Sequence, residues 1–134
     1  MDVSSLQVFP LRLHPGDDLK LKLYEFTLEK QLKAGFVLTC VGSLQKAVLR
    51  FAGKDSGTVF EQKFEIVSLV GTLSADGVHL HISVSDSEGN LKGGHLMEGS
   101  IIYTTAEITL GEIGGKEFHR DIDEETGYKE LVIK

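Results

Sequence analysis

Residues 77–96 read GVHLHISVSDSEGNLKGGHL and predict two antiparallel strands joined by a tight turn. Apolar and polar residues alternate through the first half, which is typical of a strand with one buried face. The polar SDSEGN segment then interrupts the pattern and offers a three-residue hairpin loop, Ser87-Glu88-Gly89. Its last position needs a left-handed backbone and holds glycine. The register of this hairpin decides which side chains share a face.

The stretch also places three of the chain's five histidines close together. Strand side chains alternate between faces, so His79 and His81 project from the same side, about 7 Å apart along the strand. The side chains that then face the core are Leu80, Ile82 and Val84. With the three-residue loop, Asp86 pairs with Asn90. Counting outwards gives the expected cross-strand pairs, which are Ser85 with Lys92, Ser83 with Gly94, and His81 with His95.

This register sets His95 directly across from His81, with Cβ atoms about 5 Å apart, and His79 completes a triangle. A two-residue loop at Glu88-Gly89 would instead shift the pairing by one residue and turn His95 to the other face. Three imidazoles around one open position are typical of a catalytic zinc site, whereas structural zinc sites usually fill all four positions with protein ligands. We therefore expect these histidines to bind a divalent metal ion. Zinc is favoured, and nickel or another imidazole-liking ion also fits.

Each part of this interpretation has an ordinary alternative. The histidines also fit a half-exposed polar strand face that binds nothing. Gly93 and Gly94 leave room beside the site for a ligand or another backbone segment, but they are equally typical of a bulge or a bend.

Outward from the hairpin, the sequence predicts one helix and many strands. Residues 17–35 begin with two cap-type aspartates and end at Gly35, which predicts a helix of about four turns. Pro10 interrupts an N-terminal strand and suits an edge or a bulge. Further β-like runs, separated by glycine turns, are FVLTCVGS, LQKAVLRFA, TVFEQKFEIVSLVGTL and SIIYTTAEITLGEI, and the charged tail ends in an apolar LVI that suits another strand. We expect a single α+β domain over residues 1–134, with a mostly antiparallel β-sheet packed with one main helix.

Composition narrows the functional classes. The chain has 134 residues, a formal charge of −6 and a single cysteine. It has no apolar run long enough to cross a membrane and no secretory signal, so we expect a soluble protein in the cytoplasm. Cys40 lies in the apolar run FVLTCVG and reads as a buried, inert thiol. The acidic charge repels a phosphate backbone, so direct nucleic-acid binding is not expected.

The run HLHISVSDSEGNLKGGHL, with TCVGSLQKAVLRFAG and FEIVSLVGTLS upstream, resembles the PPC domain, the plants and prokaryotes conserved domain. The H-x-H…GGH arrangement is the most specific part of the likeness and matches single-domain members. The resemblance implies an α+β fold of the class that includes acetolactate decarboxylase, assembly as a homotrimer, and a metal ion held by His79, His81 and His95. Plant members are nuclear and bind DNA through an added AT-hook, which has no counterpart in these residues.

Three functions are consistent with these observations. The favoured one is a metal-binding homotrimeric module that recognises a small molecule or a protein partner. The second is a metal-dependent hydrolase or lyase, for which Glu65, Glu98 and Arg50 are the candidate catalytic residues. The third is a DNA-associated regulatory adaptor, possible in the nucleus by family analogy alone. His119, in a charged segment, is expected to be a surface residue rather than a fourth ligand.

Overall fold

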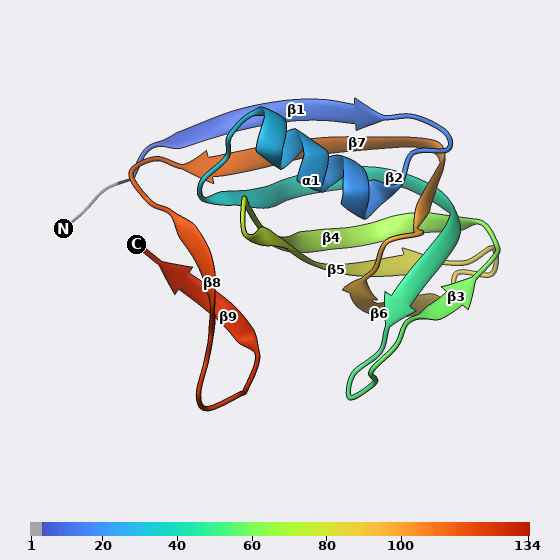
Figure 1. Cartoon of the computed structure of the whole chain (residues 1–134). Coiled ribbons are helices and arrows are strands. Elements are labelled where there is room, and N and C mark those ends of the chain that lie inside the picture. Colours follow the sequence, from blue (N-terminus) through green and yellow to red (C-terminus); the bar gives the residue numbers. More distant parts are fainter. Residues whose placement is uncertain (1–3) are drawn as a thin grey trace.

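The computed structural model describes residues 4–134, so the first three residues of the expected domain lie outside the described part (Figure 1). The fold is α+β, with a mostly antiparallel β-sheet and one helix, as predicted. Its elements in chain order are β1 (Leu6–Leu13), α1 (Leu19–Glu29), β2 (Gly35–Arg50), β3 (Thr58–Phe60), β4 (Phe64–Ser74), β5 (Gly77–Ser85), β6 (Leu91–Leu96), β7 (Ile101–Ile113), β8 (Phe118–Ile122) and β9 (Lys129–Ile133).

The main sheet has seven strands in the order β1-β7-β2-β4-β5-β6, with β3 paired to β2. The two β-like runs expected around Gly42 are one continuous strand of 16 residues, β2, which passes the glycine with bulges instead of a turn. Its far end also pairs with β6, through Leu49 with Leu96 and Arg50 with His95. The sheet therefore curls back on itself, and this closure brings Arg50 beside the predicted histidine site.

The N-terminal strand is an edge strand, as Pro10 predicted. Strand β1 pairs only with β7 among the sheet strands. A proline lacks the N–H that a second neighbour would need, so an edge position costs no ladder hydrogen bond.

Helix α1 is shorter than predicted. Asp18 caps its first turn by accepting a hydrogen bond from the backbone N–H of Leu21 at 3.1 Å. The helix has 11 residues, about three turns, and ends at Glu29. Gln31 adopts a left-handed backbone with φ of 54°, and the N–H of Leu32 then bonds the carbonyl of Thr27 at 3.0 Å. This is the Schellman arrangement usually made with glycine. Gly35, the expected terminator, instead begins β2.

The helix covers one face of the sheet, and the core lies between them (Figure 1). Leu19 and Leu23 on the helix and Leu44, Leu80 and Leu110 on the strands are fully buried there. Leu21 and Leu28 of the helix remain exposed. Within residues 4–134, no helix has the length and apolar character needed to cross a membrane.

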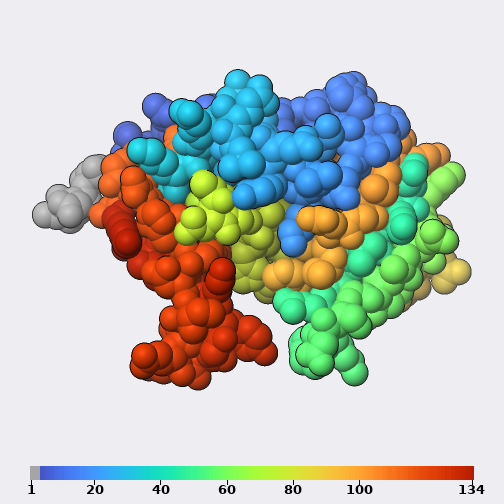
Figure 2. Space-filling model, viewed as in Figure 1, coloured from blue at the N-terminus to red at the C-terminus, as the bar shows by residue number. Residues whose placement is uncertain are grey.

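The charged tail forms a separate hairpin. Strands β8 and β9 pair only with each other, so the predicted C-terminal strand exists but does not join the main sheet. The hairpin is attached through the N–H of Phe118, which bonds the carbonyl of Lys33 at 2.8 Å. In Figure 2 it projects from the body, and a hollow separates it from the β2–β3 loop, residues 51–57.

Candidate metal centre

The hairpin between β5 and β6 has the predicted three-residue loop. Gly89 has φ of +83°, and its N–H bonds the carbonyl of Asp86 at 3.0 Å. The Asp86 carboxylate accepts hydrogen bonds from the backbone N–H groups of Glu88 and Asn90, both at 2.9 Å. These bonds lower the pKa of Asp86, because they favour its charged form. The sequence thus contains both the left-handed residue and the acceptor that stabilise this turn.

The register confirms the pairing that defines the site and corrects two others. His81 lies opposite His95, as predicted. The expected pairs of Ser85 with Lys92 and Ser83 with Gly94 are wrong, since Ser85 lies opposite Leu91 and Ser83 opposite Gly93. The hairpin has no bulge, so the pairing proceeds one residue at a time from Asp86 and Asn90. The alternating faces are as expected, with the core side chains Leu80, Ile82 and Val84 buried.

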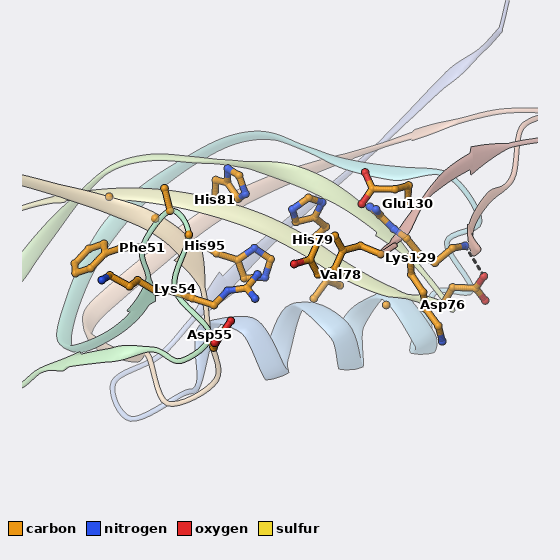
Figure 3. A pocket seen from close by; sticks show the side chains of 18 residues that line it. Phe51, Lys54, Asp55, Asp76, Val78, His79, His81, His95, Lys129 and Glu130 are labelled. Carbon is orange, nitrogen blue, oxygen red and sulfur yellow. Dashed lines mark hydrogen bonds between the residues drawn. The ribbon is translucent and has the colours of Figure 1, made fainter. Parts of the chain in front are cut away.

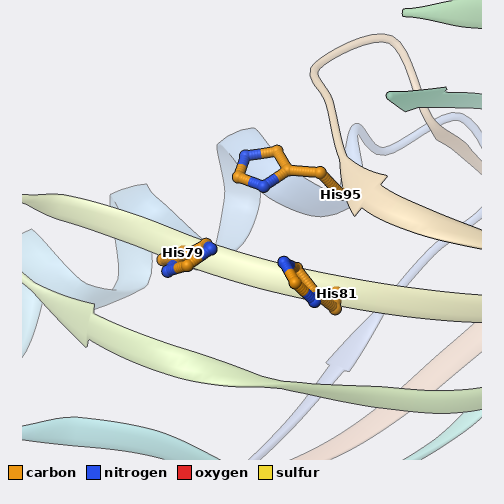
Figure 4. A group of neighbouring side chains, drawn as sticks. All are labelled: His79, His81 and His95. Atoms are coloured by element: carbon orange, nitrogen blue, oxygen red, sulfur yellow. The ribbon is translucent and has the colours of Figure 1, made fainter. Parts of the chain in front are cut away.

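The three histidines form a compact triangle (Figure 4). The ring centroids lie 5.0 Å apart for His79 and His81, 5.1 Å for His79 and His95, and 5.5 Å for His81 and His95. Each ring offers one nitrogen, and these three nitrogens lie within 4.8 Å of one another. His79 and His81 are exposed and His95 is half-buried, so an ion at this position is reachable from solvent.

The strand pairings arrange these side chains in two rows that run across the sheet. In the first, Arg50, His95, His81 and Val70 follow one another across β2, β6, β5 and β4. In the second, His79 lies opposite Thr72. Directly opposed residues share a face of the sheet, so the strand pairing by itself brings the three imidazole rings together. Gly94 permits the first row, because a Cβ there would lie 2.8 Å from the backbone oxygen of Arg50.

The surroundings keep two of the rings neutral. Partial desolvation of its ring lowers the pKa of His79, the positive charges of Arg120 and His81 lower it further, and the charge of Glu130 opposes this shift. Burial, followed by the charge of Arg50, lowers the pKa of His95 to about 4. A histidine binds a metal ion only as the neutral imidazole. Both rings are therefore available as ligands at neutral pH.

The donor set fits a zinc-type ion. Nitrogens that share a tetrahedral zinc ion at about 2.0 to 2.1 Å lie about 3.4 Å from one another. The observed spacing is within 4.8 Å, and the rings are on exposed or half-exposed side chains that can rotate. Within residues 4–134 no thiolate or fourth histidine joins the three imidazoles, which leaves one coordination position for another molecule.

The triangle lies on the wall of a groove of about 880 Å³ (Figure 3). The end of β2 and the loop after it line one side, through residues 50–55. Strands β5 and β6 contribute the histidines, and the C-terminal hairpin contributes Arg120 and residues 128–130. The hollow between the hairpin and the β2–β3 loop in Figure 2 is the mouth of this groove.

Among the residues predicted as catalytic candidates, only Arg50 lines the groove. Glu65 lies opposite Ser85, at the far end of β5 from His79, and Glu98 lies in the turn after β6; both are exposed. His119 is not part of the triangle. Its ring nitrogens lie 3.1 Å from a Glu117 oxygen and 3.5 Å from an Asp76 oxygen.

Sequence reasoning missed the groove residues on the C-terminal hairpin. Arg120 on β8 donates a hydrogen bond from Nη2 to the Thr72 hydroxyl at 2.8 Å, and Glu130 on β9 also faces the groove. Their segment shows only a run of mixed charges, which is usually a solvated surface. The apolar LVI near the end of this segment predicts a strand, but it does not predict where that strand lies in the fold.

An α+β domain with three histidines on one face of its sheet defines a class of candidate metalloproteins. Residues 2–114 match the family model described as the Plants and Prokaryotes Conserved (PCC) domain. The chain belongs to this family, the PPC domain that its sequence resembles. The β8–β9 hairpin lies beyond the matched residues.

Individual relatives extend the likeness over the whole chain. It is 48% identical over 134 residues to part of the bifunctional protein GlmU of Synechococcus sp. (strain JA-3-3Ab), and it spans only 22% of that protein's length. A solved hypothetical protein from Salmonella enterica has 39% identity and a TM-score of 0.97, covering 99% of this chain and 96% of that one. A metal-containing protein from Archaeoglobus fulgidus has 26% identity and a TM-score of 0.83, covering 98% and 99%.

Proposed function

We propose that this chain is a metal-binding, homotrimeric PPC module that recognises a small molecule or a protein partner. The observation that carries the proposal is the triangle of His79, His81 and His95, whose nitrogens lie within 4.8 Å of one another. The similar protein from Archaeoglobus fulgidus is a metal-containing protein, which supports a metal ion in this fold. Zinc is the ion we expect, because imidazole ligands suit it.

A bound ion would act as a Lewis acid with one position open to a ligand in the groove. The residues of this chain have two tasks there. The strand register orients the three imidazoles, and the lowered pKa values of His79 and His95 keep those rings neutral. The relation to GlmU favours a recognition module, because a segment like this chain makes up only 22% of that bifunctional protein.

Elemental analysis of the purified protein tests the metal. We expect one equivalent of zinc or another divalent ion per chain, and its loss in His79→Ala and His95→Ala. His119→Ala is the matched control, because it removes a histidine outside the triangle and should keep the ion. Circular dichroism checks that each variant is folded. Equal metal content in all variants, or no metal after loading with zinc, nickel or cobalt, contradicts the proposal.

The trimer is supported by an exposed apolar strip on the face of the sheet opposite the helix. Its members, Leu38, Val41, Val67 and Val70, are all more than 40% exposed. The pairs Phe36 with Thr72 and Gly42 with Ile66 enclose these residues, so the segment of β2 with Leu38 and Val41 faces the segment of β4 with Val67 and Val70. Contiguous apolar surface of this kind is typical of an interface.

A further inference from the structure

We propose that the groove binds the oxyanion group, carboxylate or phosphate, of a small molecule between Arg50 and Arg120, beside the metal centre. This inference rests on the proposed function, since it names the class of ligand for the open position. It follows from the placement of the two guanidinium groups and from the charges around them.

Arg50 is held beside the triangle by the closure of the sheet. It lies opposite His95, in the short segment where β2 pairs with β6. Its side chain is half-buried and lines the groove. Among residues 4–134, no carboxylate lies within ion-pair distance of its guanidinium. A half-buried guanidinium without an acidic partner is a ready donor for an anion.

Arg120 approaches the triangle from the opposite wall. Its Nη2 donates to the Thr72 hydroxyl at 2.8 Å, and Thr72 lies opposite His79 on the neighbouring strand. Its backbone N–H donates to Asp76 at 2.9 Å, which fixes β8 against the start of β5. The hydroxyl accepts from only one of the five N–H donors that a guanidinium carries. Within the described chain, Arg120 also forms no ion pair with a carboxylate.

The groove lining holds four basic and three acidic side chains, whereas the chain as a whole has more acidic than basic residues. Lys54 and Lys129 line it together with the two arginines, although the chain as a whole has a formal charge of −6. The acidic lining residues are Asp55, Asp76 and Glu130. Asp76 is already engaged by His119 and by the backbone of Arg120. A bound divalent ion would add further positive charge, so the centre of the groove favours an anion.

The chemistry of arginine selects an oxyanion rather than a halide. The planar guanidinium presents parallel N–H groups that match the two oxygens of a carboxylate or a phosphate. The two guanidinium groups lie on either side of the three imidazoles. This arrangement favours a ligand that would place one oxygen at a bound metal ion and its other oxygens at the arginines. Both anion types share this chemistry, and separate probes distinguish them.

The experiment uses the full chain loaded with Co²⁺, whose visible spectrum reports changes at the metal. Inorganic phosphate and acetate are titrated separately, and the concentration at half-saturation is measured. We expect at least one anion to shift the spectrum. Its half-saturation concentration should rise about tenfold to hundredfold in Arg50→Gln and in Arg120→Gln. The stronger of the two probes identifies the anion type. Arg50→Lys should give an intermediate half-saturation concentration, because lysine retains the positive charge but lacks the parallel N–H groups of the guanidinium.

Arg12→Gln is the matched control. It removes the same charge from β1, where Arg12 donates to Thr105 outside the groove, and it should bind the anion like the unmodified protein. If cobalt binds but neither anion shifts the spectrum, or if the groove variants match the control, the inference is wrong and the metal centre stands. If no metal binds, the anion site is tested by calorimetry of phosphate and of acetate with the metal-free protein. Heat that depends on both arginines supports the anion site, and no heat overturns it.

Discussion

Gly94 determines how closely β6 can approach β2. A Cβ built at this position would lie 2.8 Å from the backbone oxygen of Arg50 and 3.3 Å from its carbonyl carbon. Backbone cannot yield as the end of a flexible side chain can, so the strands would separate. The separation would act on the segment that holds Arg50 opposite His95.

We therefore predict that Gly94→Ala lowers the free energy of unfolding by about 1 to 3 kcal/mol, the usual cost of overpacking. It should also weaken metal binding, because His95 is displaced from the triangle. Guanidinium chloride denaturation and a zinc titration measure the two effects. Gly93→Ala provides the comparison, since a Cβ there meets its nearest backbone oxygen at 3.1 Å and the residue is exposed. Equal effects from the two substitutions would contradict the role given to Gly94.

Cys40 illustrates a residue whose chemistry is suppressed by its position. Cys40 is half-buried, not fully buried as expected. Its partial burial, with a further contribution from the charge of Glu107, raises the pKa of its thiol from 9.0 to about 11. The thiolate is the reactive form, so at pH 8 its fraction falls roughly 100-fold relative to an unshifted thiol. We predict correspondingly slow modification by a disulfide reagent, with a rate that rises as the pH approaches the raised pKa. Equal rates in the native and the guanidinium-unfolded protein would refute this.

Among the elements, the β5–β6 hairpin is the one on which the site depends most. Its loop requires a left-handed residue, and Gly89 supplies it with φ of +83° and no atom within 4 Å of a hypothetical Cβ. Because a new side chain at Gly89 would meet no neighbouring atom, a substitution of this residue tests the backbone conformation alone. Gly89→Val should destabilise the hairpin by about 1 to 2 kcal/mol and reduce metal affinity, whereas Gly89→Asn should be close to the unmodified protein, because asparagine tolerates this conformation.

Chemical denaturation and cobalt titration of both Gly89 variants check the prediction. If asparagine and valine have the same effect on stability and on metal affinity, the left-handed conformation is not what fixes the register.

The histidine triangle was predictable from sequence because its determinants are local. Loop length, the alternation of faces and one glycine decide the pairing of His81 with His95, and all lie within residues 77–96. The helix end was not predictable in the same way, since Gln31 adopts a conformation usually given to glycine. Arg120 was missed for a different reason. Its approach to the triangle depends on how the β8–β9 hairpin docks on Asp76 and Thr72, which lie more than 40 residues earlier in the chain.

At the scale of the whole molecule, the sheet has two unlike faces. Helix α1 covers one of them, while Val41 and Val67 on the other are 60% and 52% exposed. The strip to which they belong continues to the histidine triangle, because Val70 lies opposite His81. A trimer that covers this strip would therefore place a subunit boundary beside the triangle, while all three histidines would still come from one chain.

The proposed trimer and the proposed metal binding can therefore be tested separately. We predict that Val41→Lys converts a species with three times the 14.7 kDa chain mass into a monomer, because a charge replaces an apolar contact in each interface. The monomer should still bind one metal ion per chain. Light scattering coupled to size exclusion gives the mass, and elemental analysis of the same peak gives the metal.

Val59→Lys is the control, since Val59 is 54% exposed but lies on β3. A monomeric unmodified protein, or equal dissociation by both substitutions, would show that the strip is not the interface. Loss of the metal on dissociation would show that a neighbouring subunit completes the centre.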